Sequence, residues 1–126
     1  MNAHEDTLIS AFIAPEKRDR YRTKLSSSKR SQFLGRLNHS LDLDERFITW
    51  VKSNADIHQL LLSKGAHPTC YLLSAASELD QKVFPLEEAL ERVHSSGWGT
   101  LLSAVPGKLA YYYDECGERR GILEKA

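Results

Sequence analysis

The stretch TLLSAVPGKLAYYYDE, residues 100–115, determines which class of fold this sequence can adopt. It contains two apolar runs rich in strand-forming residues, separated by Pro106 and Gly107. A two-residue break with turn-forming side chains between two such runs is typical of a tight β-hairpin. The stretch therefore predicts a hairpin that turns at Pro106-Gly107, and a further turn around Gly117 predicts a final short strand over residues 120–124.

An apolar strand and an amphipathic helix precede this hairpin. Residues 69–77, TCYLLSAAS, form a short apolar run that indicates a buried strand. The tetrapeptide LLSA occurs within this run, at residues 72–75, and again at residues 101–104. We therefore expect two neighbouring parallel strands, buried on both faces and joined by a right-handed crossover helix. That helix, over residues 85–97, would direct four apolar side chains inward: Leu86, Ala89, Leu90 and Val93.

The first half of the chain shows helical periodicity instead. Apolar side chains recur every three or four residues in short segments that proline, serine and glycine residues delimit. The pair Asp42 and Glu45 resembles a capping box and predicts a further short helix through residues 47–51. The helix before it would direct four side chains to one inner face: Phe33, Leu34, Leu37 and Leu41.

The predicted fold is therefore α+β, in a single compact domain of residues 1–126. Residues 1–66 would form an N-terminal cluster of short helices. Residues 67–126 would form a small mixed sheet made from a strand, the crossover helix, the β-hairpin and the final short strand. The hydrophobic fraction of 41% and the charged fraction of 27% are typical of a globular protein and not of a disordered chain.

Composition also bears on where the protein acts. No apolar run approaches the ~20 residues that a membrane helix needs, so no membrane partner is expected. The first ten residues, MNAHEDTLIS, carry acidic side chains where a signal peptide would carry basic ones, which favours a cytoplasmic location. The two cysteines, Cys70 and Cys116, are expected to be free thiols, with Cys70 buried in the first strand of the sheet.

Charge is distributed unevenly although the net charge is zero. Residues 1–36 hold eight basic and four acidic side chains, whereas residues 37–126 hold nine and thirteen. Such asymmetry indicates either a polyanionic partner or a basic segment that packs against the acidic remainder of its own fold. The binding candidates on this basic face are Lys17, Arg20, Arg22, Lys24, Lys29 and Arg36.

Two further arginines lie where the helical wheel places apolar side chains. Arg18 falls on a seam with Tyr21 and Leu25, and Arg30 falls on the face of Phe33. Because an unpaired buried charge is too costly to persist, both arginines are expected to find carboxylates. The acidic remainder of the chain, residues 37–126, offers such partners, and its nearest members in the sequence are Asp42, Asp44 and Glu45.

A run of three tyrosines, residues 111–113, places aromatic rings on both faces of one predicted strand. One interpretation is an exposed aromatic platform for binding, formed by Trp98 and Tyr112. The other is that Tyr111 and Tyr113 cover the core while Tyr112 packs beneath a helix, which agrees with the high frequency of tyrosine in strands.

Catalytic motifs are missing from the sequence. His67 and Cys70 have a spacing that metal ligands use, but a structural zinc site needs four ligands, so neither a metal nor a cofactor is expected. No phosphate-binding loop and no serine-nucleophile motif occurs. The remaining enzyme hypothesis uses Cys70 as nucleophile, with His67 or His94 as its base.

Three functions follow from these observations. The first hypothesis is a small non-enzymatic cytosolic binding module that acts on a protein partner or associates with itself. The second is a nucleic-acid-binding protein that uses the basic helices of residues 15–36 to contact phosphates. The third is the small enzyme based on Cys70. In the second hypothesis, one helix face would carry Lys29, Gln32, Arg36 and His39.

Overall fold

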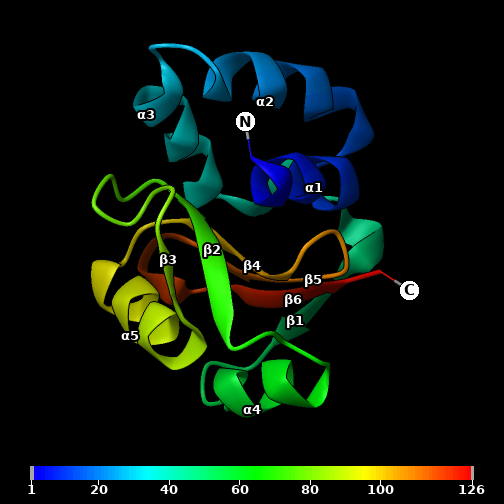
Figure 1. The fold of residues 1–126 in the computed structure, drawn as a ribbon, viewed down its shortest axis with the longest axis vertical. Helices are drawn as coiled ribbons and strands as arrows, with labels where there is room; N and C mark the ends of the chain where they lie inside the picture. Colours follow the sequence, from blue (N-terminus) through cyan, green and yellow to red (C-terminus); the bar gives the residue numbers. More distant parts are fainter. Residues whose placement is uncertain (1, 126) are drawn as a thin grey trace.

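The computed structural model describes residues 2–125 and has the α+β architecture that the sequence predicts, with N-terminal helices followed by strands (Figure 1). The helices are α1 (Ala3–Phe12), α2 (Arg18–Leu25), α3 (Arg30–Phe33), α4 (Ile57–Ser63) and α5 (Leu86–Ser96). The strands are β1 (Ile48–Val51), β2 (Thr69–Ser74), β3 (Val83–Pro85), β4 (Thr100–Val105), β5 (Leu109–Tyr113) and β6 (Arg120–Glu124).

The six strands form one sheet in the order β1-β6-β5-β4-β2-β3. The predicted hairpin is confirmed, because β4 and β5 pair antiparallel around the turn that contains Gly107, whose φ of +73° a glycine adopts without strain. The predicted final strand is confirmed as β6, which pairs with β5 and carries β1 on its other edge. The hairpin therefore supplies the centre of the sheet.

The expectation of two neighbouring parallel strands is wrong. β2 and β4 are neighbours, but they run antiparallel, with Ser74 opposite Thr100. β3, which the sequence analysis missed, pairs antiparallel with the other edge of β2. Consequently α5 connects β3 to β4, which run in the same direction on either side of β2. Every neighbouring pair in the sheet is antiparallel, so the sheet is not mixed.

The prediction of parallel strands failed because a continuous apolar run indicates that a strand is buried on both faces, but does not indicate the direction in which the strand runs. The sheet lies between two layers of helices, with α1, α2 and α3 on one face and α4 and α5 on the other (Figure 1). Leu101 and Tyr112 pack with the N-terminal helices. Leu102 and Tyr111, their neighbours along the strands, pack against α4 and α5. Because both faces are covered, these antiparallel strands are as continuously apolar as parallel ones.

The predicted helix through residues 47–51 is also wrong, since β1 occupies this segment. The carboxylate of Asp44 accepts a hydrogen bond from the backbone N–H of Arg46, and it caps a single helical turn only. The four residues that follow, ITWV, are β-branched or aromatic and pair along β6. Gly121 of β6 leaves room for them, because a Cβ atom at this position would lie 2.5 Å from Cδ1 of Ile48.

The helix that begins at Arg30 is shorter than predicted. α3 gives way to a 3₁₀ segment, Leu34–Asn38, and His39 is already extended. Asn38 holds this end of the chain to the sheet, because its side-chain oxygen accepts a hydrogen bond of 2.7 Å from the N–H of Gly99. Leu41 is therefore not on an inner face, as predicted, but is 79% exposed.

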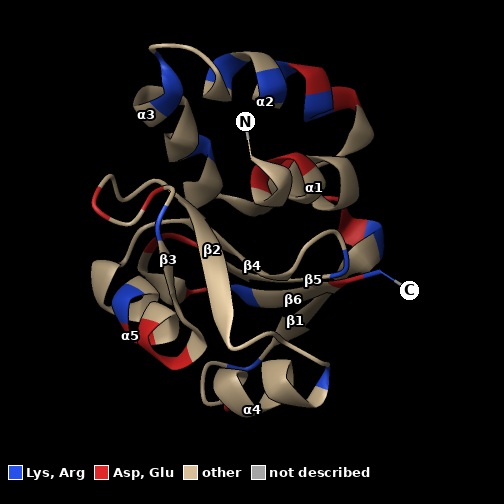
Figure 2. Ribbon diagram, viewed as in Figure 1, with Lys and Arg blue, Asp and Glu red and all other residues tan. Residues whose placement is uncertain are grey.

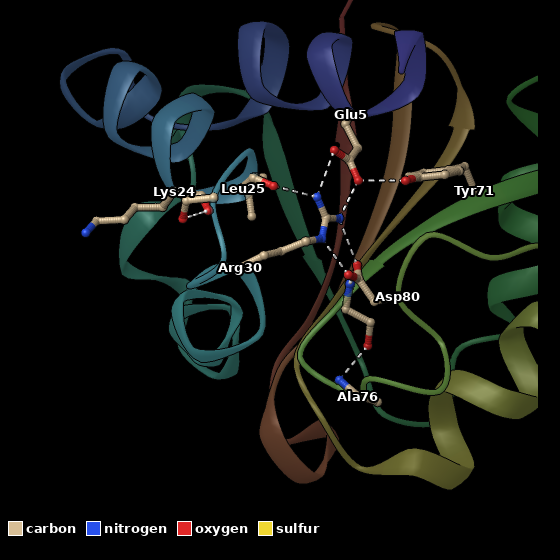
Figure 3. A network of polar contacts seen from close by, with 9 residues as sticks. Glu5, Lys24, Leu25, Arg30, Tyr71, Ala76 and Asp80 are labelled. Carbon is tan, nitrogen blue, oxygen red and sulfur yellow. Dashed lines mark hydrogen bonds and ion pairs between the residues drawn. The ribbon is translucent and has the colours of Figure 1, made fainter. Parts of the chain in front are cut away.

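A buried ion-pair network joins the helical layer to the sheet (Figure 3). Arg30 donates from Nε to Asp80 at 2.7 Å and from Nη1 to Glu5 at 3.1 Å, and a second donor of the same guanidinium also reaches Glu5. The hydroxyl of Tyr71 on β2 donates to Glu5 at 2.6 Å. Asp80 in turn accepts from the backbone N–H of Ser74 at 3.1 Å. One guanidinium thus fixes α1, α3 and the loop between β2 and β3.

Both inward-facing arginines have carboxylate partners, as expected, although not always the nearest ones. Arg18 donates to the carbonyl oxygen of Ile13 at 3.0 Å, and its guanidinium lies 3.8 Å from the carboxylate of Asp44. For Arg30, Asp80 lies in the acidic remainder of the chain, as expected, but it is not one of the three nearest residues named above, and the second partner, Glu5, lies in the basic segment itself. Only the folded sheet brings these carboxylates to Arg30.

Replacing Arg30 with alanine tests the importance of this network. Glu5 is 2% exposed, so Arg30→Ala leaves a buried carboxylate without its cation, and we expect the free energy of unfolding to fall by about 3–5 kcal/mol. Lys29→Ala, the control, removes an exposed cation that has no ion pair within residues 2–125 and should change stability by less than about 0.5 kcal/mol. Urea denaturation measures both. Equal effects would contradict the role given to Arg30.

Cys70 provides a second test, of the sheet itself. The predicted burial of Cys70 is confirmed, because it is 1% exposed and burial raises the pKa of its thiol to about 12. Cys116 is exposed. A neutral alkylating reagent should therefore label Cys116 of the native protein rapidly and Cys70 only after unfolding. Mass spectrometry of the labelled peptides measures this, and fast labelling of native Cys70 would show that the placement of β2 is incorrect.

Candidate anion-binding pocket

Four of the six predicted basic residues converge on one pocket between α2 and α3, the two helices with the blue segments at one end of the molecule (Figure 2). The pocket has a volume of about 290 Å³. Its lining consists of Arg20, Lys24, Lys29, Gln32, Phe33 and Arg36. Lys17 and Arg22, the other two predicted residues, lie outside it.

The local sequence explains why these side chains meet. Arg20 and Lys24 are one turn apart on α2 and therefore share a face. The serine-rich turn after α2 reverses the chain, and Ser27 stabilises it by donating to the carbonyl oxygen of Lys24 at 2.7 Å and accepting from the N–H of Lys29 at 3.1 Å. Lys29 immediately precedes α3, so the reversal brings it toward the basic face of α2. The side chain of Lys24 points away from the buried network of Arg30 (Figure 3).

Phe33 forms the base of the pocket. Its ring is 8% exposed and packs edge-on against Tyr21, with 4.8 Å between the ring centroids. The guanidinium carbons of Arg20 and Arg36 both lie 5.8 Å from the centroid of Phe33. Contact with an aromatic ring attracts a guanidinium and limits its motion. Phe33 therefore holds the two arginines beside the pocket.

Asp42 holds the guanidinium group of Arg36 in place. It accepts hydrogen bonds from Nε and Nη2 of Arg36 at 2.7 and 2.8 Å, and from the hydroxyl of Tyr21 at 2.6 Å. Lys17 lies 2.9 Å from the same carboxylate. Burial alone would raise the pKa of Asp42, but the hydrogen bonds from Arg36, Tyr21 and Lys17 outweigh burial and hold this pKa below its usual range. Asp42 therefore remains ionised and orients Arg36.

The two basic residues outside the pocket have partners within the fold. Lys17 binds Asp42 and also donates to the carbonyl oxygen of Leu41 at 3.0 Å. Arg22 points toward α1, where it donates to the hydroxyl of Ser10 at 2.6 Å and lies 3.4 Å from the carboxylate of Asp6. These contacts stabilise the packing of α2 and direct both cations away from Phe33.

The pocket keeps a positive charge that the fold does not neutralise. Within residues 2–125, Arg20, Lys24 and Lys29 form no ion pair. No carboxylate contributes to the lining. The shared face of Lys29 and Arg36 was visible in the sequence, whereas Phe33 as the base and Asp42 as the anchor of Arg36 were not, because both roles depend on how α3 ends. The arrangement is suited to binding an anion.

The exposed aromatic platform is wrong. Tyr112 has no exposed surface, and its hydroxyl donates to the carbonyl oxygen of Leu37 at 2.7 Å. Tyr111 and Tyr113 cover the core beneath α5, so the alternative interpretation of the tyrosine run is confirmed. Trp98 is 47% exposed. The N-terminal helices cover the face of the sheet on which Tyr112 lies. Sequence periodicity could not predict which face of the sheet these helices would cover.

The histidines suggested as bases for Cys70 make other contacts. His94 lies 2.9 Å from the hydroxyl of Tyr111, and burial lowers its pKa. The backbone N–H of His67 donates to Ala104. His4, which the sequence analysis did not consider, lies 2.9 Å from the hydroxyl of Ser103, but Ser103 has no exposed surface and cannot meet a substrate without a conformational change.

Residues 2–125 contain no cluster of three histidine, cysteine or acidic side chains that could hold a metal ion. Within the same residues, every helix is too short or too polar to cross a membrane.

No protein-family model, curated protein or solved structure matches this chain.

Replacing Asp42 with asparagine tests how the pocket is anchored. At pH 7, Asp42→Asn should lower the free energy of unfolding by about 2–3 kcal/mol, because charge-assisted hydrogen bonds are lost. The folded protein holds the pKa of Asp42 below its unfolded value, so this contribution is present above about pH 4 and falls as the carboxylate becomes protonated. The difference between wild type and variant should therefore shrink from pH 7 to pH 3.

Urea denaturation at both pH values measures this difference. Asp19→Asn is the matched control, because Asp19 is exposed on α2 and forms no ion pair within the described residues. A loss for Asp42→Asn that matches the control, or that is equally large at both pH values, would contradict the anchoring role.

Proposed function

We propose that this protein is a small non-enzymatic binding module that docks an acidic segment of a protein partner in the pocket between α2 and α3. One observation carries the proposal: Arg20, Lys24 and Lys29 converge there without ion pairs within residues 2–125, next to an Arg36 that Asp42 holds in place. A positive pocket with fixed guanidinium groups attracts carboxylates and phosphates, and it disfavours neutral or basic partners.

The distribution of the other basic residues favours a protein partner over nucleic acid. Of the eight basic residues in the first 36, five form ion pairs with acidic residues of the fold. A nucleic-acid module needs cations along a phosphate backbone, over roughly 600–1,000 Å² for a single module. α3 has only four residues and cannot serve as a recognition helix that lies along a groove. Three unpaired cations at one point suit a short acidic segment better.

The proposal includes a cytoplasmic location. Cys70 and Cys116 are both free thiols, and exposed free thiols such as Cys116 are typical of a reducing compartment. A second copy of this chain is another source of acidic side chains, because Glu87, Glu88 and Glu91 of α5 line an open surface depression, together with Arg92. Self-association then becomes one outcome of the binding experiment.

The docking proposal predicts binding to acidic peptides that depends on the pocket. A fluorescent peptide rich in glutamate and aspartate should bind, and Arg20→Glu/Lys24→Glu should weaken binding at least about tenfold, since charge reversal replaces attraction by repulsion. Lys52→Glu/Lys82→Glu is the matched control: it changes the net charge equally, at exposed positions outside the pocket lining. Fluorescence anisotropy measures binding, and sedimentation velocity detects self-association.

Two results would overturn this proposal. The first is equal weakening by both double variants, which would mean that the peptide responds to net charge alone. The second is submicromolar binding of duplex DNA or single-stranded RNA that falls steeply with salt and is lost in a folded Lys29→Glu/Arg36→Glu variant, which would establish the nucleic-acid function instead.

A further inference from the structure

The pocket holds more positive charge than one carboxylate can neutralise. Arg20, Lys24 and Lys29 have no acidic partner within residues 2–125, and the lining includes no carboxylate. A carboxylate brings one negative charge and two oxygens. A phosphate monoester brings a charge of about −1.5 to −2 at pH 7 and three strong acceptor oxygens. The charge of the pocket therefore matches a monoester better.

The pocket has room for a single phosphate group. Its volume of about 290 Å³ accommodates a phosphorylated side chain. Phe33 offers little surface for base stacking, because it is 8% exposed and two guanidinium groups lie over its ring. The lining therefore favours a single anionic group over a nucleotide.

Arg36 is oriented for an oxyanion. Its Nε and Nη2 atoms bind Asp42, whereas Nη1 has no hydrogen-bond partner within the described residues. The side chain is 40% exposed and contributes to the lining of the pocket. Because Asp42 already restricts the guanidinium, little side-chain entropy is lost when Arg36 binds a ligand. Asp42 is therefore a positioning residue for Arg36.

From these contacts we propose that the pocket recognises a phosphorylated serine or threonine in the partner. This inference rests on the proposed docking of an acidic protein segment, and it names the chemical group that is bound. Arg20 and Arg36, which both lie next to Phe33, would bind the phosphate oxygens, as paired guanidinium groups commonly do, and Lys24 and Lys29 would complete the neutralisation.

A phosphorylated lipid headgroup would present the same chemical group, but it is a less favoured ligand than a phosphorylated side chain. Proteins that bind headgroups at a lipid surface commonly insert apolar side chains beside the basic site. The large apolar side chains that are exposed within residues 2–125 are Leu41, Leu62, Val83 and Trp98, and none of them lines this pocket.

Degenerate peptide pools test the inference directly. Three fluorescent nine-residue pools with the same degenerate flanks would carry phosphoserine, glutamate or serine at the fixed centre. We expect the phosphoserine pool to bind at least about tenfold more tightly than the glutamate pool, since its extra charge and oxygen engage additional cations. Lowering the pH from 7.5 to 5 should weaken only the phosphoserine pool, because a phosphate monoester loses its second charge near pH 6.

The variant Arg36→Lys tests whether Arg36 binds the phosphate or has only a structural role. Lysine keeps the charge but loses the planar fork, so this variant should lose most of the preference for phosphoserine and retain binding of the glutamate pool. Lys52→Glu/Lys82→Glu remains the control for net charge. A folded Arg36→Lys protein with an unchanged preference would overturn the role of Arg36.

The outcomes separate this inference from the proposed function. Equal binding of the phosphoserine and glutamate pools would refute the inference and leave docking of an acidic segment intact. Failure of both pools to bind would refute the two together. Tighter binding of single-stranded RNA, or of vesicles containing phosphoinositide, than of the phosphoserine pool would overturn the inference in favour of a phosphodiester or a lipid headgroup.

Discussion

The ion pairs of Arg30 with Glu5 and Asp80 are the interaction on which the position of the helical layer depends. Arg30 lies at the start of α3, Glu5 on α1 and Asp80 in the loop after β2, so one guanidinium joins three segments that are distant in the sequence. Burial lowers the pKa of Arg30, but the hydrogen bonds that Arg30 donates to Asp80 and Glu5 reverse this effect and raise the pKa above its usual value. Arg30 therefore stays charged, and its ion pairs fix the start of α3 next to both acids.

The position of α3 determines which basic residues pair within the fold and which stay available to bind another molecule. Arg18, Arg22 and Lys17 stabilise the packing of α2 through Asp44, Asp6 and Asp42. The remaining cations of the two helices lie on their solvent side, around Phe33. The basic residues of this segment therefore have two uses. Some of them pair with carboxylates of α1 and of the segment before β1, and the others form a positive pocket between α2 and α3.

Sequence patterns predicted the features that depend on neighbouring residues. The turn at Gly107, the helix of α5 and the burial of Cys70 follow from spacing and composition alone. The relative direction of β2 and β4 could not be predicted in the same way, because it depends on β3, the strand between β2 and α5 along the chain. β3 is an edge strand of three residues that ends in proline, so the sequence shows no apolar alternation there. Likewise, Lys29 and Arg36 could be placed on one face, but the turn that brings Arg20 to them, and the carboxylate that orients Arg36, depend on contacts between distant segments.

Arginine side-chain NMR reports on the pocket one residue at a time, because the Nε–Hε signal of each arginine is sensitive to its own contacts. During titration with the phosphoserine pool at pH 7.5, we expect the signals of Arg20 and Arg36 to shift, while those of Arg46 and Arg92, which pair with acidic residues outside the pocket, remain unchanged. Saturable shifts at Arg46 or Arg92 without shifts at Arg20 and Arg36, or no shift at any arginine, would contradict the assignment of function to this pocket.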